Sequence, residues 1–346
     1  MTPTTARALR RLVAGTLLVA AAPLCLASRD ALPPDPTAGA MPTGVTSPIA
    51  DDAAEALWWG DFDRLEPLYR SVRQSTDRVD GGATRLQWFR SGLARVFEED
   101  DATDPYFAQL EAMTHAWAVE RPTSALAQLL YARALYARAW SFRGGDYSNK
   151  VSAPAMREFE RYIKLELAQL TSHADVLKDE STADVYLMMV GRNQGWSFER
   201  LHALALDTLA RNSADEGGFL ELAMASLPKW GGTPRQFDLV VHEATRRVMP
   251  EAGMAMYAYF YDDSSSGFQG ELFSASDVDW ATMRRGFRDW MAHWPSEYML
   301  NRFALDACRA EDKPTTVEIL DRIGSKPLER AWGNRFEACR RWARSP

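Results

Sequence analysis

The sequence has few of the residues from which metal centres are built. Among its 346 residues there are only three cysteines and five histidines, and the histidines are dispersed along the chain. His242-Glu243 begins like the His-Glu-x-x-His helix of a zinc protease, but Arg246 stands where the second histidine is required. We therefore predict no metal site.

Motifs for catalysis and for cofactor binding are missing as well. The sequence contains no Gly-x-Ser-x-Gly segment, which would expose a catalytic serine on a sharp turn. The glycine pairs Gly144-Gly145 and Gly231-Gly232 are not followed by the Lys-Ser/Thr of a phosphate-binding loop. They are typical of breaks between helices. We therefore predict neither catalytic residues nor a cofactor.

The chain has no excess of basic charge. Its formal net charge is −7, and removal of residues 1–27, which contain three arginines and no acidic residue, would make it −10. Non-specific binding to nucleic acid and adhesion to anionic lipid both need a basic surface. We therefore expect no nucleic-acid partner.

Strand patterns are almost absent, and apolar residues recur instead at helical spacing. After Pro122 they fall every three or four positions as far as Trp140. Thr233 and Gln236 form a capping box, which marks the start of another helix. The short apolar run 254–261 fits either a strand or a buried inner helix, and we predict the helix.

The helices recur with an almost constant period. If Thr182, Asp215 and Glu251 mark equivalent helix starts, the intervals are 33 and 36 residues. A tetratricopeptide unit has about 34 residues. We predict an all-α fold in which tetratricopeptide-like helix-turn-helix repeats stack as an α-solenoid with a concave surface.

The N-terminal residues have the pattern of an export signal. Three arginines within residues 7–11 precede an apolar stretch, Leu12 to Ala27, with small residues before a cleavage point. We predict a signal peptide over 1–27 and a Pro/Thr/Ala/Gly-rich flexible linker over 28–50. As an uncleaved anchor the apolar stretch is marginal, because it includes Pro23 and is shorter than the roughly 20 residues needed to span a bilayer, and we expect no transmembrane span after processing. Export to the periplasm or cell envelope follows, with lipidation at Cys25 as the weaker alternative.

The remaining chain is predicted to form two parts. Residues 51–265 are assigned to the tetratricopeptide-like domain, and residues 266–346 to C-terminal helical repeats or a cap. Within the first part, a helix that starts at Asp63, with Glu66 as its capping-box partner, would have Pro67 near its first turn, whereas an earlier start would put a kink at Pro67. The acidic stretch Glu98 to Asp104 lacks the spacing and glycine of a calcium loop and is expected to be solvated.

Three short motifs occur in an order that resembles a bacterial family. They are AWSFRGGDY at 139–147, NQGWSFER at 193–200 and LPKWGGT at 227–233. This order is similar to that in domain-of-unknown-function family 4034 (DUF4034), a tetratricopeptide-like group, over about residues 55 to 265. The resemblance implies a helical-repeat fold and leaves the activity open, because the family has no assigned function.

Aromatic residues give the most promising candidate surface. Tyrosine and tryptophan anchor peptides in grooves, and neighbouring carboxylates would hold a basic partner. The predicted groove consists of Tyr257, Tyr259, Tyr261, Asp262, Asp263, Trp280, Trp290 and Trp294. We therefore expect a non-catalytic envelope scaffold that binds a protein or peptide.

The alternative is an all-α hydrolase that acts on envelope carbohydrate. Its carboxylates would come from the stretch Glu98 to Asp104 or from Asp262-Asp263, and they would face each other across a deep pocket. The sequence does not decide between these two classes of function.

Two cysteines remain after the predicted signal peptide. Cys308 and Cys339 are 31 residues apart, close to one repeat, so equivalent helices of successive units would bring them together. An oxidising compartment would then favour a disulfide. Two buried free thiols are the alternative.

Overall fold

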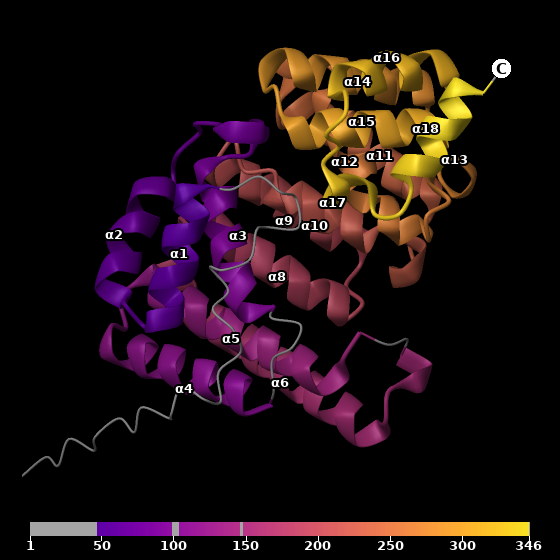
Figure 1. Cartoon of the computed structure of the whole chain (residues 1–346). Helices are drawn as coiled ribbons and strands as arrows, with labels where there is room; N and C mark the ends of the chain where they lie inside the picture. Colours follow the sequence, from indigo (N-terminus) through magenta and orange to yellow (C-terminus); the bar gives the residue numbers. More distant parts are fainter. Residues whose placement is uncertain (1–46, 99–103, 146–147, 346) are drawn as a thin grey trace, which may run out of the picture. The chain divides into compact units, whose positions relative to one another are not determined.

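The described chain is built from helices. A computed structural model describes residues 47–98, 104–145 and 148–345, all within one compact unit (Figure 1). Over these ranges the chain forms α-helices and short 3₁₀ helices but no strand. The all-α class is therefore confirmed for these residues. The predicted signal peptide and most of the predicted linker lie outside them.

Three helices begin the described chain: α1 (Pro48–Trp59), α2 (Phe62–Val72) and α3 (Arg85–Phe97). The linker prediction was wrong at its end, because residues 48–50 already belong to α1. Helix α2 has the earlier of the two starts that the sequence left open. The Asp61 carboxylate accepts a hydrogen bond from Arg64 N at 3.0 Å and caps the helix, so Pro67 lies inside it.

Helices α1 and α3 approach each other closely at Gly92. A Cβ atom at this position would lie 2.2 Å from the carbonyl oxygen of Ala50, which is closer than atoms can pack. The glycine thus permits the contact between the two helices. Leu57 of α1 and Phe89 of α3 are buried in the core.

The next group centres on one buried helix. It comprises α4 (Asp104–Glu120), α5 (Ala125–Arg143), α6 (Ala153–Ser172) and α7 (Ala174–Leu177). Helix α5 packs against both α4 and α6. The Ser124 hydroxyl caps α5 by accepting a hydrogen bond from Ala127 N at 3.1 Å. Residues Leu126 to Ala139 of α5 are buried except Tyr131, so this helix has almost no solvated face.

The middle of the chain forms α8 (Ser181–Asn193), α9 (Phe198–Arg211), α10 (Gly217–Ala225), α11 (Pro234–Arg247) and α12 (Ala255–Asp263). The Thr233 hydroxyl caps α11 by accepting from Gln236 N at 3.1 Å, as the capping box predicts. The run 254–261 lies mainly in α12, a buried helix, so the helix prediction was correct there.

The C-terminal part comprises α13 (Leu272–Ala275), α14 (Trp280–His293), α15 (Glu297–Arg309), α16 (Lys313–Ile323), α17 (Glu329–Trp332) and α18 (Phe336–Arg344). Helix α12 packs on α14 across the boundary predicted at 265/266. One hydrophobic cluster continues from Met188 to Ala343. The two predicted parts therefore share a core.

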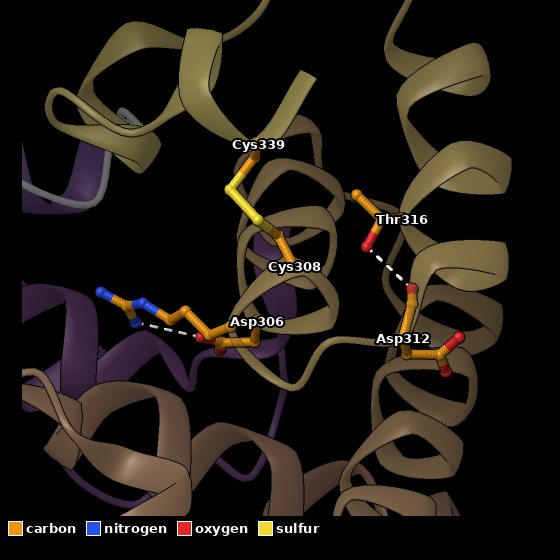
Figure 2. The surroundings of a disulfide bond; sticks show 6 residues. Asp306, Cys308, Asp312, Thr316 and Cys339 are labelled. Carbon is orange, nitrogen blue, oxygen red and sulfur yellow. Dashed lines mark hydrogen bonds and ion pairs between the residues drawn. A yellow bond between two sulfur atoms is a disulfide. The ribbon is translucent and has the colours of Figure 1, made fainter. Parts of the chain in front are cut away.

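A disulfide joins the end of the chain to α15 (Figure 2). It links Cys308 of α15 to Cys339 of α18, whose Cα atoms are 5.9 Å apart. Of the two alternatives that the sequence left open, a disulfide and two free thiols, the structure has the disulfide. Trp332 of α17 adds a second tie, because its Nε1 donates to Asn301 Oδ1 of α15 at 2.7 Å.

Candidate functional site

Half of the residues of the predicted aromatic groove lie in the interior. Tyr257, Tyr261, Asp262 and Trp290 are buried, with at most 6% of each residue exposed. The Tyr261 hydroxyl donates to Asp238 Oδ1 at 2.8 Å. The Tyr257 hydroxyl accepts from the backbone N of Asp279 at 2.9 Å, at the start of α14. These two tyrosines therefore hold the core together and are not the wall of an open groove.

The two aspartates of the predicted groove also separate. Asp263 is exposed, whereas Asp262 is buried. Its Oδ1 accepts a hydrogen bond from Arg302 Nε at 2.7 Å and forms an ion pair with Arg302 Nη2, also at 2.7 Å. Asp306 of α15 is fully buried beside Asp262. Burial and the neighbouring Asp262 carboxylate raise the pKa of Asp306 to about 8. Asp262, Arg302 and Asp306 thus form a buried polar cluster that joins α12 to α15.

Trp280 and Trp294 are half-buried, and their side chains contact different neighbours. Trp280 Nε1 donates to Asp312 Oδ2 at 2.9 Å, which ties α14 to the start of α16. The Trp294 ring lies edge-to-face with Trp290, with centroids 5.6 Å apart. A Cβ atom on Gly82 would come within 2.9 Å of Trp290 and 3.1 Å of Trp294. The turn before α3 therefore packs directly on these rings.

Tyr259 and Trp290 line a small pocket, here called the Trp290 pocket. Its cavity volume is about 100 Å³. The lining residues are Gly81, Ala83, Gln87, Trp88, Ser91, Tyr259, Trp290, Ser296, Tyr298 and Met299. The pocket therefore lies where α3 meets α12, α14 and the start of α15.

Two indole groups give the Trp290 pocket its chemistry. Trp88 and Trp290 are 5% and 3% exposed, and the Nε1 atom of each is buried without a hydrogen-bond partner. The Tyr259 ring stacks on Trp290 with centroids 5.2 Å apart, and its hydroxyl accepts from Gln87 Nε2 at 3.0 Å. The pocket is thus a largely apolar space, and two of the tryptophans that line it each have an unpaired N–H donor.

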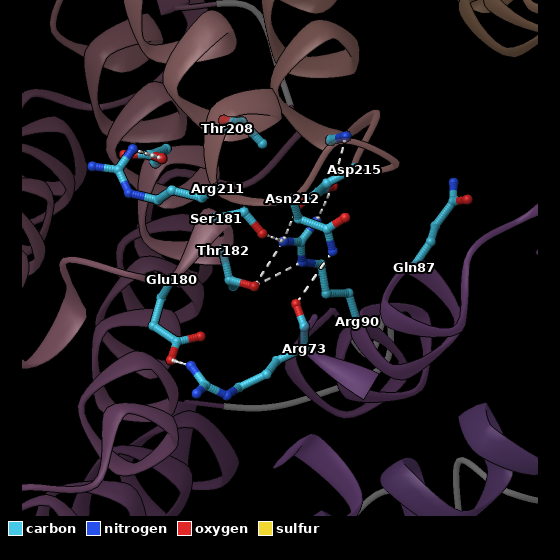
Figure 3. Close-up of polar contacts among 12 residues, drawn as sticks. Arg73, Gln87, Arg90, Glu180, Ser181, Thr182, Thr208, Arg211, Asn212 and Asp215 are labelled. Atoms are coloured by element: carbon cyan, nitrogen blue, oxygen red, sulfur yellow. Dashed lines mark hydrogen bonds and ion pairs between the residues drawn. The ribbon is translucent and has the colours of Figure 1, made fainter. Parts of the chain in front are cut away.

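An ion pair positions α3, which supplies Trp88 and Gln87 (Figure 3). The Arg90 guanidinium donates to both carboxylate oxygens of Asp215 at 2.7 Å and to the Thr182 hydroxyl at 2.7 and 3.0 Å. Burial alone would raise the pKa of Asp215, but the Arg90 guanidinium holds it below its ordinary value. This bidentate contact fixes α3 against α8 and the turn before α10.

Further polar contacts join the N-terminal helices to the same region. Glu180, which precedes α8, accepts hydrogen bonds from the Tyr69 hydroxyl and from Arg73. The Asn212 side chain donates to the carbonyl oxygen of Arg73 at 3.2 Å (Figure 3). These contacts fix α2 against the segments before α8 and after α9.

The acidic stretch predicted as a solvated loop is described only at its ends. Glu98 forms an ion pair with Arg133, and Asp104 begins α4 and pairs with Arg138 at 2.8 Å. Residues 99–103 lie outside the described ranges. Among the described residues no group of three or more histidine, cysteine, aspartate or glutamate side chains is arranged to hold a metal ion.

Sequence reasoning identified Tyr259 and Trp290 but missed Trp88 and Gln87. Gln87 and Tyr259 are 172 residues apart, and their hydrogen bond depends on how α3 packs against α12. Trp88 looks like an ordinary core residue in the periodicity of α3. No local signal in the sequence could have placed it beside Trp290.

No protein-family model, curated protein or solved structure matches this chain. In the described part of the chain, no helix has both the length and the apolar character needed to cross a bilayer.

Proposed function

We propose that this protein is a non-catalytic scaffold of the cell envelope that binds a protein or peptide partner, and that the Trp290 pocket receives part of that partner. The observation that carries the proposal is the pair of buried, unpaired indole N–H groups of Trp88 and Trp290. Buried donors are nearly always satisfied, so each exception needs an explanation. A bound acceptor, such as a peptide carbonyl oxygen, would supply it.

The size of the pocket favours a large partner over a free small molecule. Pockets for small ligands usually enclose about 300 to 1,000 Å³. The Trp290 pocket, with about 100 Å³, takes little more than one carbonyl group and a short side chain. The rest of a ligand would have to lie outside it, as the remainder of a peptide does.

The lining of the pocket also bears on the hydrolase alternative. No carboxylate is among the described residues that line the Trp290 pocket. Of the carboxylates considered for catalysis, Asp262 is bound to Arg302, and Glu98 is bound to Arg133. Glycoside hydrolysis needs two carboxyl groups that flank the scissile bond. These ion pairs support binding without turnover.

The finer features of the fold and location are also proposals. Consecutive helices pack on each other at α5–α6, α8–α9 and α15–α16, which supports stacked tetratricopeptide-like pairs. The disulfide between Cys308 and Cys339 fits an oxidising compartment and supports export. The signal peptide over 1–27 and the resemblance to family 4034 stay predictions. N-terminal sequencing of the mature protein from an envelope fraction tests the export proposal.

Selection from a random peptide library displayed on phage tests the binding proposal. We expect enriched peptides whose binding weakens in Trp88→Phe and Trp290→Phe, because each change keeps a ring and removes one N–H donor. Trp59→Phe is the matched control, since Trp59 is 53% exposed on α1 and does not line the pocket. The proposal fails if no peptide is enriched, or if the three variants bind the selected peptides equally.

Turnover is measured separately with purified peptidoglycan. Cleavage that is lost on Asp262→Asn or Asp263→Asn replacement would replace the scaffold proposal with the hydrolase alternative.

A further inference from the structure

A second and larger pocket, here called the Trp140 pocket, lies beside α5. Its cavity volume is about 490 Å³, and its walls include Phe97, Glu98, Phe107, Arg133, Tyr136 and Trp140. None of these residues lines the Trp290 pocket. A volume of this size lies within the range of small-molecule pockets. The predicted groove did not include any of these residues.

Arg133 is a buried, charged residue that lines this pocket. The residue is 5% exposed, and its guanidinium lies over the rings of Tyr136 and Phe97, at 4.8 and 5.8 Å from their centroids. Its Nη2 pairs with Glu98, whereas its Nη1 is buried without a hydrogen-bond partner. One edge of a buried, permanently charged guanidinium therefore lacks an acceptor.

Trp140 supplies a second unpaired donor. Its Nε1 is buried and has no hydrogen-bond partner, although the ring itself lines the pocket. The guanidinium of Arg143 lies 4.7 Å from the centroid of this ring and adds positive charge nearby. The ring edge of Phe159 also packs on it, with centroids 5.4 Å apart. The ring is thus held in place while its N–H donor stays unused.

Two acidic residues, Glu98 and Glu166, lie near the guanidinium of Arg133. Glu98 is already bound to Arg133, and its side chain is 61% exposed to solvent. Glu166 of α6 is fully buried near Arg133, and neither of its carboxyl oxygens has a hydrogen-bond partner. Burial raises the pKa of Glu166 well above its ordinary value, which favours its uncharged form.

We propose that the Trp140 pocket binds a small carboxylic acid with an apolar body, whose carboxylate accepts hydrogen bonds from Arg133 Nη1 and Trp140 Nε1. The rings of Phe97, Phe107 and Tyr136 would cover the apolar part of the ligand. A carboxylate satisfies both unpaired donors, which an ammonium group cannot do. An external cation would also compete with Arg133 and Arg143 for the same aromatic faces.

Calorimetric titration of the mature protein with 3-phenylpropionate, indole-3-acetate and octanoate tests this proposal. Each acid is compared with its primary amide, which has the same apolar body and no charge. We expect at least one acid to bind about tenfold or more tightly than its amide, because hydrogen bonds to charged groups contribute about 1.5–3 kcal/mol.

Two variants assign the binding to this pocket. Trp140→Phe keeps an aromatic ring and removes the N–H donor, and we expect it to weaken binding about three- to tenfold. Arg133→Gln should weaken binding by more than about tenfold. If Arg133→Gln does not fold, Trp140→Phe and the comparison of acids with amides decide the question.

Arg161→Gln is the matched control. It also removes a guanidinium that lies over a tyrosine, at 4.2 Å from the Tyr162 centroid, but Arg161 is outside the Trp140 pocket. We expect its affinity to equal that of the unchanged protein. The proposal is overturned if none of the three acids binds, if acids and amides bind alike, or if Arg161→Gln weakens binding as much as Trp140→Phe. A negative result for the Trp140 pocket does not bear on the proposal for the Trp290 pocket, because the two pockets share no lining residue.

Discussion

The contact between Arg90 and Asp215 gives the most direct test of how α3 is held. In Arg90→Met the apolar stem is retained, while the Asp215 carboxylate loses both hydrogen bonds to the guanidinium. The Asp215 side chain is 2% exposed, so water cannot replace them. It would keep its bond to the backbone N of Gly217 at 2.9 Å.

The expected magnitude follows from the burial of the pair. Removal of one partner of a buried ion pair usually costs about 3–5 kcal/mol, because the remaining charge is buried without compensation. Replacing both charged groups costs far less. We therefore expect Arg90→Met to lower the free energy of unfolding by about 3 kcal/mol or more, and Arg90→Met with Asp215→Asn to recover at least about half of that loss.

The pH dependence gives a second check on the same mechanism. In the unchanged protein Arg90 lowers the pKa of Asp215, so the pair stabilises the fold at neutral pH and this contribution is lost as pH falls through the lowered pKa. Without Arg90, burial would raise that pKa, and protonation would remove the unpaired charge. The difference between variant and unchanged protein should therefore shrink at acid pH.

Urea denaturation followed by far-ultraviolet circular dichroism measures these differences. The reasoning is refuted if Arg90→Met costs less than about 1 kcal/mol at neutral pH. It is also refuted if the double variant is as unstable as the single one, since the loss would then not come from an unpaired carboxylate.

Two further predictions concern the C-terminal part. Replacing Cys308 and Cys339 by serine should lower the free energy of unfolding by about 3–4 kcal/mol on the chain-entropy model. In the unchanged protein, thiol labelling under denaturing, non-reducing conditions should find neither of these two cysteines as a free thiol. Burial raises the pKa of Asp306 to about 8, so the folded state favours the protonated side chain. The contribution of Asp306 to the free energy of unfolding is therefore fully present below the ordinary aspartate pKa and is lost as pH rises toward 8. Asp306→Asn should therefore flatten the fall in stability across this range, as measured by urea denaturation; an unchanged pH profile would contradict the assignment.

Much of the secondary structure follows from the sequence because its causes are local. Helical spacing of apolar residues and the cap at Thr233 depend on neighbours within a few positions, and both agree with the structure. The sequence left the start of α2 open because Asp61 and Asp63 both offer a suitable carboxylate. Only the observed backbone shows which of them accepts the first hydrogen bond.

Tertiary structure alone decided which aromatic residues line a pocket. The sequence shows that Tyr257, Tyr259 and Trp290 are bulky and close to helical spacing, which is equally true of core and groove residues. Packing against α14 buries Tyr257, whereas the approach of α3 leaves Tyr259 and Trp290 at a small cavity with Trp88. Composition and periodicity thus determined the all-α class. Contacts between residues more than 100 positions apart decided where unpaired donors gather, because burial depends on the chain's distant segments.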